Sequence, residues 1–569
     1  MSIHLHEPGH EPPGEGIDIL FVTGDAYADH PSNGVAVLSR LLDAHGYHIG
    51  IIDQPPHESR GSMAALGTPR LCAAVTAGLM DSMVANYTPL KRVREDESTG
   101  YPGVRRPDRA TIAYTHAVRR DLKGVPVVIG GIEASLRRFA HYDYWQNTVR
   151  RSILIDSKAD ILVYGMGERQ MLEMARRLKD GVPLSGIRGT CTKEKKPPEH
   201  CISLPPFDEV SSDKKAFMRS FLLQEGGMHP LRSPPLAESY GAWHVVQHPP
   251  SVPLCTAEMD ALYELPFTRR VTQTPRGRTR AIEGIQFSII AHRGCFGSCS
   301  FCSLAMHQGT VIQSRSQESI LREARSFLSH PDFKGIIDDV GGPTANMYGM
   351  GCGGPVDAIS VPSIIDGSPV TVHIPRRTCG RTCLNPVCPS LRSDHGPYRE
   401  VLAALRSLPG VRHVFVHSGI RHDLALGDPA FLDDLCAHHV SGQLKIAPEH
   451  ADPGVLAAMN KPPVGVYHAF RKAYEESSRR AGKKQFIVPY LMVAHPCSTP
   501  AAGRMLQRML KDHDIPVEQV QVFTPTPMTL STAMYHTGLD RHMRAVYVPY
   551  GYGEKKEQKR WALGARKIK

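Results

Sequence analysis

Three cysteines stand close together near the middle of the chain, at the spacing C-x3-C-x2-C. They are Cys295, Cys299 and Cys302, and they directly follow the apolar segment 284–292. Apolar runs of this length, rich in β-branched residues, are typical of buried β-strands. The chain has 13 cysteines in 569 residues, so this spacing would arise by chance in only about 0.7% of such chains. The pattern predicts a strand that ends in a loop carrying three thiols.

Three thiolates on one loop can hold three irons of a four-iron cluster, which leaves the fourth iron without a protein ligand. S-adenosylmethionine can chelate that iron, and an electron from the reduced cluster can then break its C5′–S bond and release a 5′-deoxyadenosyl radical. Phe301, beside the last cysteine, would suit packing against the adenine. The alternatives are a zinc site or three buried thiols, but the spacing lacks a nearby fourth ligand.

Composition limits the compartment and the partners. The first residues carry acids, histidines and prolines rather than a basic and then apolar run, and no window approaches 18 apolar residues. We therefore expect a cytoplasmic protein without a membrane partner, in which the cysteines stay reduced. The formal net charge is +11, which is compatible with a nucleic-acid partner but does not require one.

The first third of the chain alternates strand-like and helix-like segments. Residues 17–22, 48–53, 125–131 and 159–165 are typical of strands, with helical patterns between them. Such alternation predicts an α/β fold with a Rossmann-like, doubly wound parallel sheet over residues 1–185. From 186 to 281 the pattern weakens and prolines accumulate, so this part is predicted to be a connector.

A second alternation runs over residues 282–530. About six βα units fit a complete or partial (β/α) barrel, whose chemistry would lie at the carboxyl ends of the strands. A cysteine-rich insert interrupts this part. Residues 531–569 form a basic C-terminal extension, whose last 15 residues we expect to be solvated or frayed.

Longer motifs carry a resemblance to a known family. They are FVTGDAYADHPSNG near the start, VVQHPPSVPL before the cysteine loop, RGCFGSCSFCSLAMHQG at that loop, and GGPTANMYGMGC and LKIAPEH after it. Over almost its whole length the chain resembles the YgiQ family of radical S-adenosylmethionine proteins. The resemblance implies an N-terminal domain, a radical S-adenosylmethionine partial barrel and an enzyme that abstracts hydrogen from an unidentified substrate. Its electron donor would be a flavodoxin or a ferredoxin.

Within that resemblance, a glycine-rich turn would bind the methionine amino group of the cofactor through backbone carbonyls. The turn is Gly341-Gly342-Pro343, after the second strand of the barrel. Pro343 stands where the usual pattern often has Glu, so only the backbone contribution is expected.

Later strand ends supply candidates for the carboxylate and ribose hydroxyls of the cofactor. These are Ser418, Arg421 and Glu449. Arginine can clamp a carboxylate with two hydrogen bonds, and a glutamate can accept from a diol. The alternative is that Arg421 or Glu449 forms a structural ion pair.

Four further cysteines lie in the insert. Cys352, Cys379, Cys383 and Cys388 could together hold a zinc ion or a second iron–sulfur cluster, and the spacing does not separate these two. The alternative is four separate thiols.

The predicted N-terminal domain is similar to cobalamin-binding domains. The histidine motif of such domains is D-x-H-x-x-G, whereas Asp29 and His30 are adjacent here. We therefore do not expect cobalamin, and expect His30 to be a hydrogen-bonding loop residue. Arg137, Arg138 and His141 are either an anion-facing cluster or a solvated helix face.

Three functions compete. The first is a radical enzyme of unidentified reaction. The second is a methylthiotransferase-like or cobalamin-type methylase-like modification of RNA or protein, because residues 448–462 and 522–535 resemble parts of methylthiotransferases. The third is a non-catalytic iron–sulfur or zinc protein that binds RNA through its basic surface.

Overall fold

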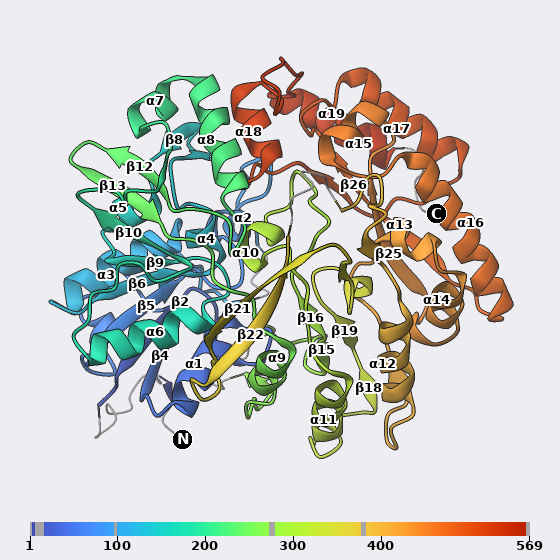
Figure 1. The fold of residues 1–569 in the computed structure, drawn as a ribbon. Helices are drawn as coiled ribbons and strands as arrows, with labels where there is room; N and C mark the ends of the chain where they lie inside the picture. Colours follow the sequence, from blue (N-terminus) through green and yellow to red (C-terminus); the bar gives the residue numbers. More distant parts are fainter. Residues whose placement is uncertain (1–2, 6–15, 96–98, 272–278, 377–382, 565–569) are drawn as a thin grey trace. The chain divides into compact units, whose positions relative to one another are not determined.

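The structure is a computed structural model that describes residues 3–5, 16–95, 99–271, 279–376 and 383–564. It divides into two compact units, which are described one at a time; Figure 1 traces the chain from blue to red. The first unit contains residues 1–253, 261–286 and 359–372. The second contains residues 254–260, 287–358 and 373–569.

A large sheet organises the first unit. Within the described residues it has ten strands. The first six strands in sheet order run parallel to one another, whereas β10 is antiparallel to β9 and β13 is antiparallel to both β10 and β12. In sheet order the strands are β1 (Ile3–Leu5), β4 (Ile49–Asp53), β2 (Ile19–Thr23), β5 (Cys72–Thr76), β6 (Val127–Gly130), β9 (Ile161–Val163), β10 (Thr190–Glu194), β13 (Trp243–Gln247), β12 (Leu236–Tyr240) and β11 (Ile202–Ser203).

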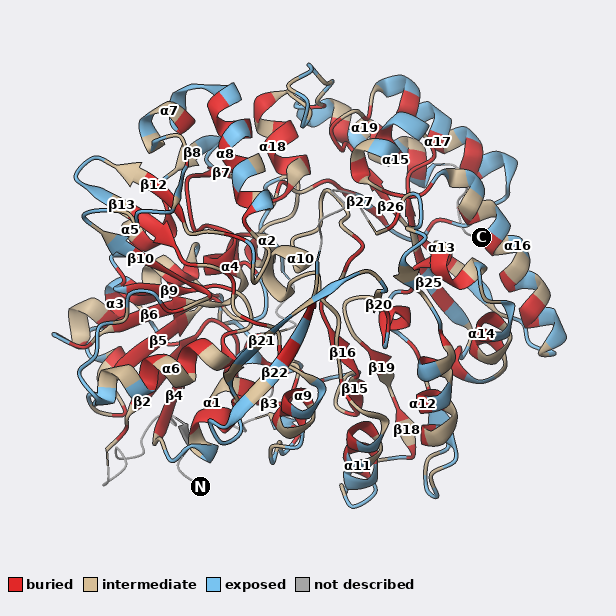
Figure 2. Cartoon of the chain, in the orientation of Figure 1, coloured by how far each residue is buried: buried red, intermediate tan, exposed pale blue. Residues whose placement is uncertain are grey.

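Helices cover both faces of this sheet. On one face α1 (Gly34–Ala44) and α6 (Glu168–Lys179) pack against the strands. On the other face α3 (Ala110–Asp121) and α5 (Ile153–Ser157) do the same. The central strands are buried on both sides, as Figure 2 shows in red, which is why they are continuous apolar runs. The predicted α/β, doubly wound sheet is confirmed.

Residues 186–281 were predicted as a connector, but their described part, residues 186–271 and 279–281, contains strands of the sheet and helices. Residues 190–247 contribute β10 to β13 to the sheet, together with α7 (Phe207–Ser212) and α8 (Lys214–Gly226). The prolines explain why the pattern looked weak. They mark the boundaries of short elements, as Pro206 does immediately before α7, rather than a region without structure. Further along, β14 (Arg270–Val271) pairs with β3 (Ala28–Asp29).

The remaining elements of residues 16–271 are short. In the first unit they are η1 (Ser62–Ala64), α2 (Ser82–Asn86), α4 (Gly131–Ser135) and the hairpin β7 (His141–Asp143) and β8 (Thr148–Arg150). Helix α9 (Thr256–Tyr263) begins in the second unit, which includes residues 254–260.

The second unit is built from successive parallel strands and helices. Its described residues hold six βα repeats, which agrees with the predicted partial barrel; β15 pairs with β19, β18 with β24, and β26 with both β25 and β27, all in parallel. The strands are β15 (Ser288–Ile290), β18 (Ile336–Ile337), β19 (Asp339–Gly341), β24 (His413–Val414), β25 (Gln443–Glu449), β26 (Phe486–Val493) and β27 (Val520–Val522). The helices are α10 (Leu304–Gln308), α11 (Gln317–Phe327), η2 (Ala345–Met347), α12 (Gly396–Arg406), α13 (His422–Leu426), α14 (Pro429–Asp434), η3 (Leu435–His439), α15 (Pro453–Met459), α16 (Val464–Arg480), α17 (Pro500–Asp512), α18 (Leu530–Thr537) and α19 (Tyr552–Leu563).

The second unit also contains antiparallel pairs of short strands. β16 (His292–Arg293) pairs with β17 (Gln313–Ser314), and β20 (Gly351–Cys352) pairs with β23 (Leu391–Arg392). Between β20 and β23 in sequence lies the hairpin β21 (Val356–Pro362) and β22 (Pro369–Pro375), of which residues 359–372 belong to the first unit. Within the described parts of the chain, no helix has the length and apolar character needed to cross a bilayer.

Residues 555–563 of the basic C-terminal tail are part of helix α19, contrary to the expectation of a frayed tail, whereas residues 565–569 lie outside the described residues. Helix α19 packs against α17, and the aromatic ring of Trp561 lies against Gly503. Gln558, which is fully buried, donates to the Ser498 carbonyl and accepts from the Ala494 backbone N–H and the Ser498 hydroxyl. These contacts to the end of β26 anchor the helix.

We expect Gln558→Ala to destabilise the protein by about 2–3 kcal/mol, because it leaves buried backbone groups at Ala494 and Ser498 without partners. Thermal unfolding under anaerobic conditions would measure the loss. Arg560→Ala on the exposed face of the same helix is the control, with an expected change below about 0.5 kcal/mol. Equal effects of the two substitutions would contradict the anchoring role of Gln558.

Candidate functional site

The three-cysteine loop lies between β16 and α10 in the second unit. Backbone bonds hold it from several sides: the Cys295 N–H donates to the Gly309 carbonyl at 3.1 Å, and the Ser300 N–H donates to the Met459 carbonyl at 3.0 Å. The Asn460 side chain also donates to the Ser298 carbonyl at 2.9 Å. The loop is thus fixed by residues distant in sequence, before any ligand is considered.

Hydrogen-bond donors surround the sulfurs. The Gly297 N–H lies 3.4 Å from Cys295 Sγ, and the Arg421 guanidinium lies 3.7 Å from Cys299 Sγ. Burial, followed by the charge of Cys299, raises the pKa of Cys302 to about 12. The free thiol therefore stays protonated at neutral pH, and binding of a cation would have to displace its proton.

Among the described residues no set of three His, Cys, Asp or Glu side chains converges to hold a single metal ion. This finding argues against a site for a single zinc ion, but it does not argue against a four-iron cluster. Ligands of one ion must meet at a point, whereas each thiolate of a four-iron cluster binds a different iron. Three thiols on one loop, with donors facing their sulfurs and no carboxylate bonded to them, fit the cluster.

The predicted glycine turn comes directly after β19, beside this loop. The hydroxyl of Thr344, which follows Gly341-Gly342-Pro343, lies 3.8 Å from Cys295 Sγ. A β-carbon on Gly341 would stand 2.5 Å from Ser418 Oγ, and one on Gly342 would stand 2.7 Å from the His292 carbonyl oxygen. Only glycine fits at either position, because the turn packs directly against Ser418 and His292.

His292 packs against the same turn. Its ring is fully buried, and within the described residues neither ring nitrogen has a hydrogen bond of good geometry. Burial lowers the pKa of His292 to about 4, although the backbone of Thr344 opposes the shift. The imidazole is therefore neutral at physiological pH.

Ser418 and Arg421 are brought to this turn, but each already has a carboxylate partner. The Ser418 hydroxyl donates to Asp339. Arg421 forms two hydrogen bonds with Asp423, at 2.8 Å from Nε and 2.5 Å from Nη2. Burial alone would lower the pKa of Arg421, but Asp423 outweighs it and the pKa is raised. Arg421 thus forms a structural ion pair, which was the alternative to binding the cofactor carboxylate. Its Nη1 remains directed at Cys299.

Glu449 ends β25 in a strained conformation. Its φ of +68° lies in the left-handed region, and a register shift separates it from Ile446. The carboxylate is buried and lies 3.5 Å from Lys461 Nζ; burial raises its pKa, which Lys461 and then Arg421 oppose. Non-glycine residues held at positive φ cluster at functional sites.

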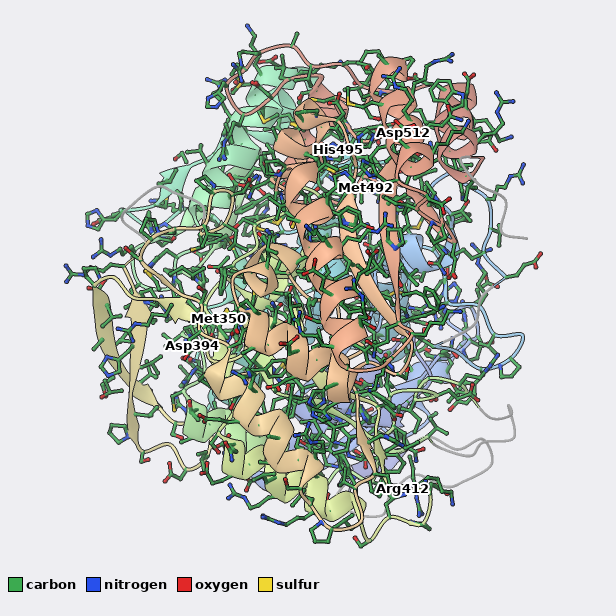
Figure 3. The ribbon with its side chains drawn as sticks, turned by 90° about the vertical axis from the view of Figure 1, so that its right-hand side faces the viewer. Met350, Asp394, Arg412, Met492, His495 and Asp512 are labelled. Atoms are coloured by element: carbon green, nitrogen blue, oxygen red, sulfur yellow. The ribbon has the colours of Figure 1, made fainter. Side chains whose placement is uncertain are left out.

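Phe301 makes an edge contact with His495, with ring centroids 6.3 Å apart. His495 follows the end of β26 and is labelled in Figure 3. Its Nδ1 donates to the Pro496 carbonyl and its Nε2 accepts from the Ser531 hydroxyl. These two hydrogen bonds hold the ring of His495 in one orientation, and Phe301 packs against it.

The second cysteine group is only partly described. Cys379 lies outside the described residues, whereas Cys352, Cys383 and Cys388 lie around the β20–β23 pair. The Cys388 N–H donates to the Cys383 carbonyl at 2.9 Å, and Cys352 is opposite Leu391 in the pair. Among the described residues these three cysteines do not converge to hold one metal ion, and a metal centre shared with Cys379 remains a prediction.

The polar residues of the first unit serve its fold. His30 is fully buried between Ser32 and Arg269, with ring contacts of 2.7 and 2.9 Å, as expected for a hydrogen-bonding loop histidine. Arg137 is buried in an ion pair with Asp81.

Arg138 and His141 are also buried, Arg138 over the ring of Tyr164. Neither the anion-facing cluster nor the solvated helix face is observed, because all three side chains are buried against partners within the unit. Arg138 packs on Tyr164, Arg137 pairs with Asp81, and His141 interacts with the charge of Asp143.

Sequence reasoning missed His292, Asp339, Asp423 and Lys461. The signal for the aspartates was available, since Asp423 stands two residues from Arg421 and Asp339 begins the glycine-rich segment. Lys461 follows the C-cap of α15, and only the fold brings it to Glu449.

We expect Gly342→Ala to prevent S-adenosylmethionine binding, because the added methyl group must displace the His292 backbone. Gly419→Ala, next to Ser418, is the matched control, since a β-carbon there meets nothing within 4 Å. Equilibrium dialysis with the cofactor compares the two. If Gly342→Ala binds as Gly419→Ala does, the turn does not form part of the cofactor site.

Comparison with known proteins agrees with this arrangement. Residues 10–288 match the family described as Radical SAM N-terminal, and residues 518–550 match a domain of unknown function, DUF3362. A UPF0313 protein of Geobacter sulfurreducens is 47% identical, with 95% of this chain and 89% of that protein covered. One from Methanocella arvoryzae is 45% identical with the same coverage.

A solved structure shares the fold. It is the radical S-adenosylmethionine methyltransferase TsrM from Kitasatospora setae, solved with cobalamin and a [4Fe-4S] cluster bound; the TM-score is 0.52 at 14% identity, with 95% of this chain and 91% of that chain covered. The family and the fold support a radical S-adenosylmethionine enzyme with a [4Fe-4S] cluster. The chain belongs to the UPF0313 family, the YgiQ-type radical S-adenosylmethionine proteins.

Proposed function

We propose that Cys295, Cys299 and Cys302 hold the [4Fe-4S] cluster and that S-adenosylmethionine binds beside it, for abstraction of hydrogen from an unidentified substrate. One observation carries the proposal: the three-thiol loop and the Gly341-Gly342 turn meet, with 3.8 Å between Cys295 Sγ and Thr344 Oγ1. Two ends of parallel barrel strands thus supply both halves of one site.

When bound and reduced, the cluster supplies one electron that breaks the C5′–S bond of S-adenosylmethionine, giving methionine and a 5′-deoxyadenosyl radical that takes a hydrogen atom from the substrate. The chain's own residues position the reactants. The Gly341–Thr344 backbone accepts from the methionine amino group. Arg421, held by Asp423, offsets thiolate charge at Cys299 through Nη1.

Glu449, Ser418 and Phe301 complete the proposed cofactor site. Glu449 is held by Lys461 and accepts from a ribose hydroxyl. Ser418, held by Asp339, shapes the turn, and Phe301 packs against the adenine. The electron donor is proposed to be a flavodoxin or ferredoxin, and a nucleic-acid substrate is compatible with the net charge of +11. We place the protein in the cytoplasm, where such donors occur.

A cobalamin-dependent methylase is the second candidate, because of the fold shared with TsrM. The first unit argues against cobalamin. Both ring nitrogens of His30 are already partnered. In addition, segment 99–106 bonds to three strand ends: Tyr101 to Asp53 at 2.7 Å, and Arg106 to Asp25 at 2.6 Å and to the Ala77 carbonyl at 3.3 Å. Segment 99–106 therefore occupies the ends of β2, β4 and β5 at the sheet edge that binds ligands in Rossmann-like folds.

We expect Cys295→Ala, Cys299→Ala or Cys302→Ala to abolish formation of 5′-deoxyadenosine, because each removes one iron ligand. The assay uses anaerobically reconstituted protein, dithionite and S-adenosylmethionine, with the product measured by chromatography. Cys201→Ala, in the first unit, should leave the yield unchanged. Undiminished product from the triple variant would refute the cluster assignment.

A second metal centre at Cys352, Cys383 and Cys388, with Cys379, is tested by metal analysis of the Cys295/Cys299/Cys302 triple alanine variant. We expect that protein to retain zinc or iron, and to lose it when Cys352, Cys383 and Cys388 are also replaced. If the triple variant holds neither metal above background, the insert cysteines are separate thiols.

A further inference from the structure

Arg421 is fixed beside the three-cysteine loop through its backbone as well as through its side chain. Its backbone N–H donates to Asn346 Oδ1 at 2.8 Å, and its carbonyl accepts from Asn346 Nδ2 at 3.1 Å. Asn346 is fully buried and lies in η2, two residues after Thr344 of the glycine-rich turn. The barrel itself therefore determines where the guanidinium begins.

The guanidinium divides its nitrogens between two partners. Nε and Nη2 donate to the two carboxylate oxygens of Asp423, at 2.8 and 2.5 Å, whereas Nη1 lies 3.7 Å from Cys299 Sγ. The Nε–Nη2 edge is the kind of two-nitrogen fork that carboxylates favour. Because Asp423 occupies this edge, the side chain is turned so that Nη1 faces the cysteine loop.

Gly297 gives this nitrogen room between the first two cysteines of the loop. A β-carbon on Gly297 would stand 3.3 Å from Cys295 Sγ and 3.7 Å from Arg421 Nη1. Burial raises the pKa of Cys295, and the charge of Arg421 opposes this shift. The positive end of the Arg421–Asp423 pair thus acts on the sulfurs of both Cys295 and Cys299.

The charge of Asp423 balances that of Arg421 in a buried environment. The two side chains are only 7% and 6% exposed, and charges interact strongly where water is excluded. Reduction adds one negative charge to an iron–sulfur cluster, so an uncompensated cation beside its sulfurs stabilises the reduced form and raises the reduction potential. The pair instead offers the sulfurs a hydrogen-bond donor without a net positive charge.

We propose that Asp423 is a positioning residue for the cluster: it directs Arg421 Nη1 at the sulfurs and cancels the charge of Arg421, which keeps the reduction potential of the bound cluster low. This inference rests on the proposed function. Transfer of one electron to the sulfonium of S-adenosylmethionine needs a strongly reducing cluster, and cancellation of the buried guanidinium charge serves that need.

The test is a redox titration, followed by electron paramagnetic resonance, of the full-length, anaerobically reconstituted protein without S-adenosylmethionine. Asp423→Asn removes the carboxylate charge, and we expect the ratio of reduced to oxidised cluster at a fixed potential to rise about tenfold, or about 59 mV for one electron. Asp423→Glu keeps the charge and should stay within about threefold of the wild-type ratio.

Glu475→Gln is the matched control. It removes a carboxylate from an ion pair with Arg471 on α16, whose glutamate is 52% exposed, and solvent screens a charge at such a position. We expect the reduction potential of this variant to equal that of wild type.

A double variant decides the question if Asp423→Asn does not fold or does not hold the cluster. Arg421→Gln/Asp423→Asn removes both charges and leaves no buried ion without a partner, so its ratio of reduced to oxidised cluster should lie within about threefold of wild type. A wild-type potential in Asp423→Asn, or a shift of about tenfold in the double variant, overturns the inference and leaves the cluster assignment intact. Absence of the reduced-cluster signal in wild type itself overturns both.

Discussion

The backbone of the three-cysteine loop is tied to three distant parts of the second unit, and the site depends on these ties. Gly309 accepts from Cys295, Met459 accepts from Ser300, and Ser531 donates to the Ser300 carbonyl. A loop that had to order itself around a ligand would lose backbone entropy on binding. Here the first, fourth and sixth βα repeats have already fixed the loop, so the position of the sulfurs is determined by the barrel.

The two units differ in the hydrogen bonding of the polar groups named here at their strand ends. In the first unit, Asp25, Asp53 and the Ala77 carbonyl are bonded to segment 99–106. In the second, His292 and His450 keep ring nitrogens without good partners in the described residues, next to ion pairs that hold Arg421 and Glu449. Desolvated groups without partners destabilise a fold unless something else satisfies them.

The fold and the site differ in how much of each could be predicted from sequence. Periodic apolar segments predicted the parallel sheet and the βα repeats, because burial on both faces produces continuous apolar strands. Strands β10 to β13 were not anticipated, since short antiparallel strands flanked by prolines leave a weak pattern. Cysteine spacing identified the three-thiol loop. The partners of Ser418, Arg421 and Glu449 could not be predicted in full, because Lys461 reaches Glu449 only through the packing of α15, and burial of Arg137 and Arg138 depends on tertiary partners.

The path of the chain through the two units limits how the protein can be divided into fragments. Each unit is made of three separate segments, and the chain passes between the units at residues 253/254, 260/261, 286/287, 358/359 and 372/373. No single cut can therefore release either unit intact, because a truncation after residue 286 would leave the first unit without 359–372. Gene fragments that encode one unit alone would be incomplete on both sides of the break.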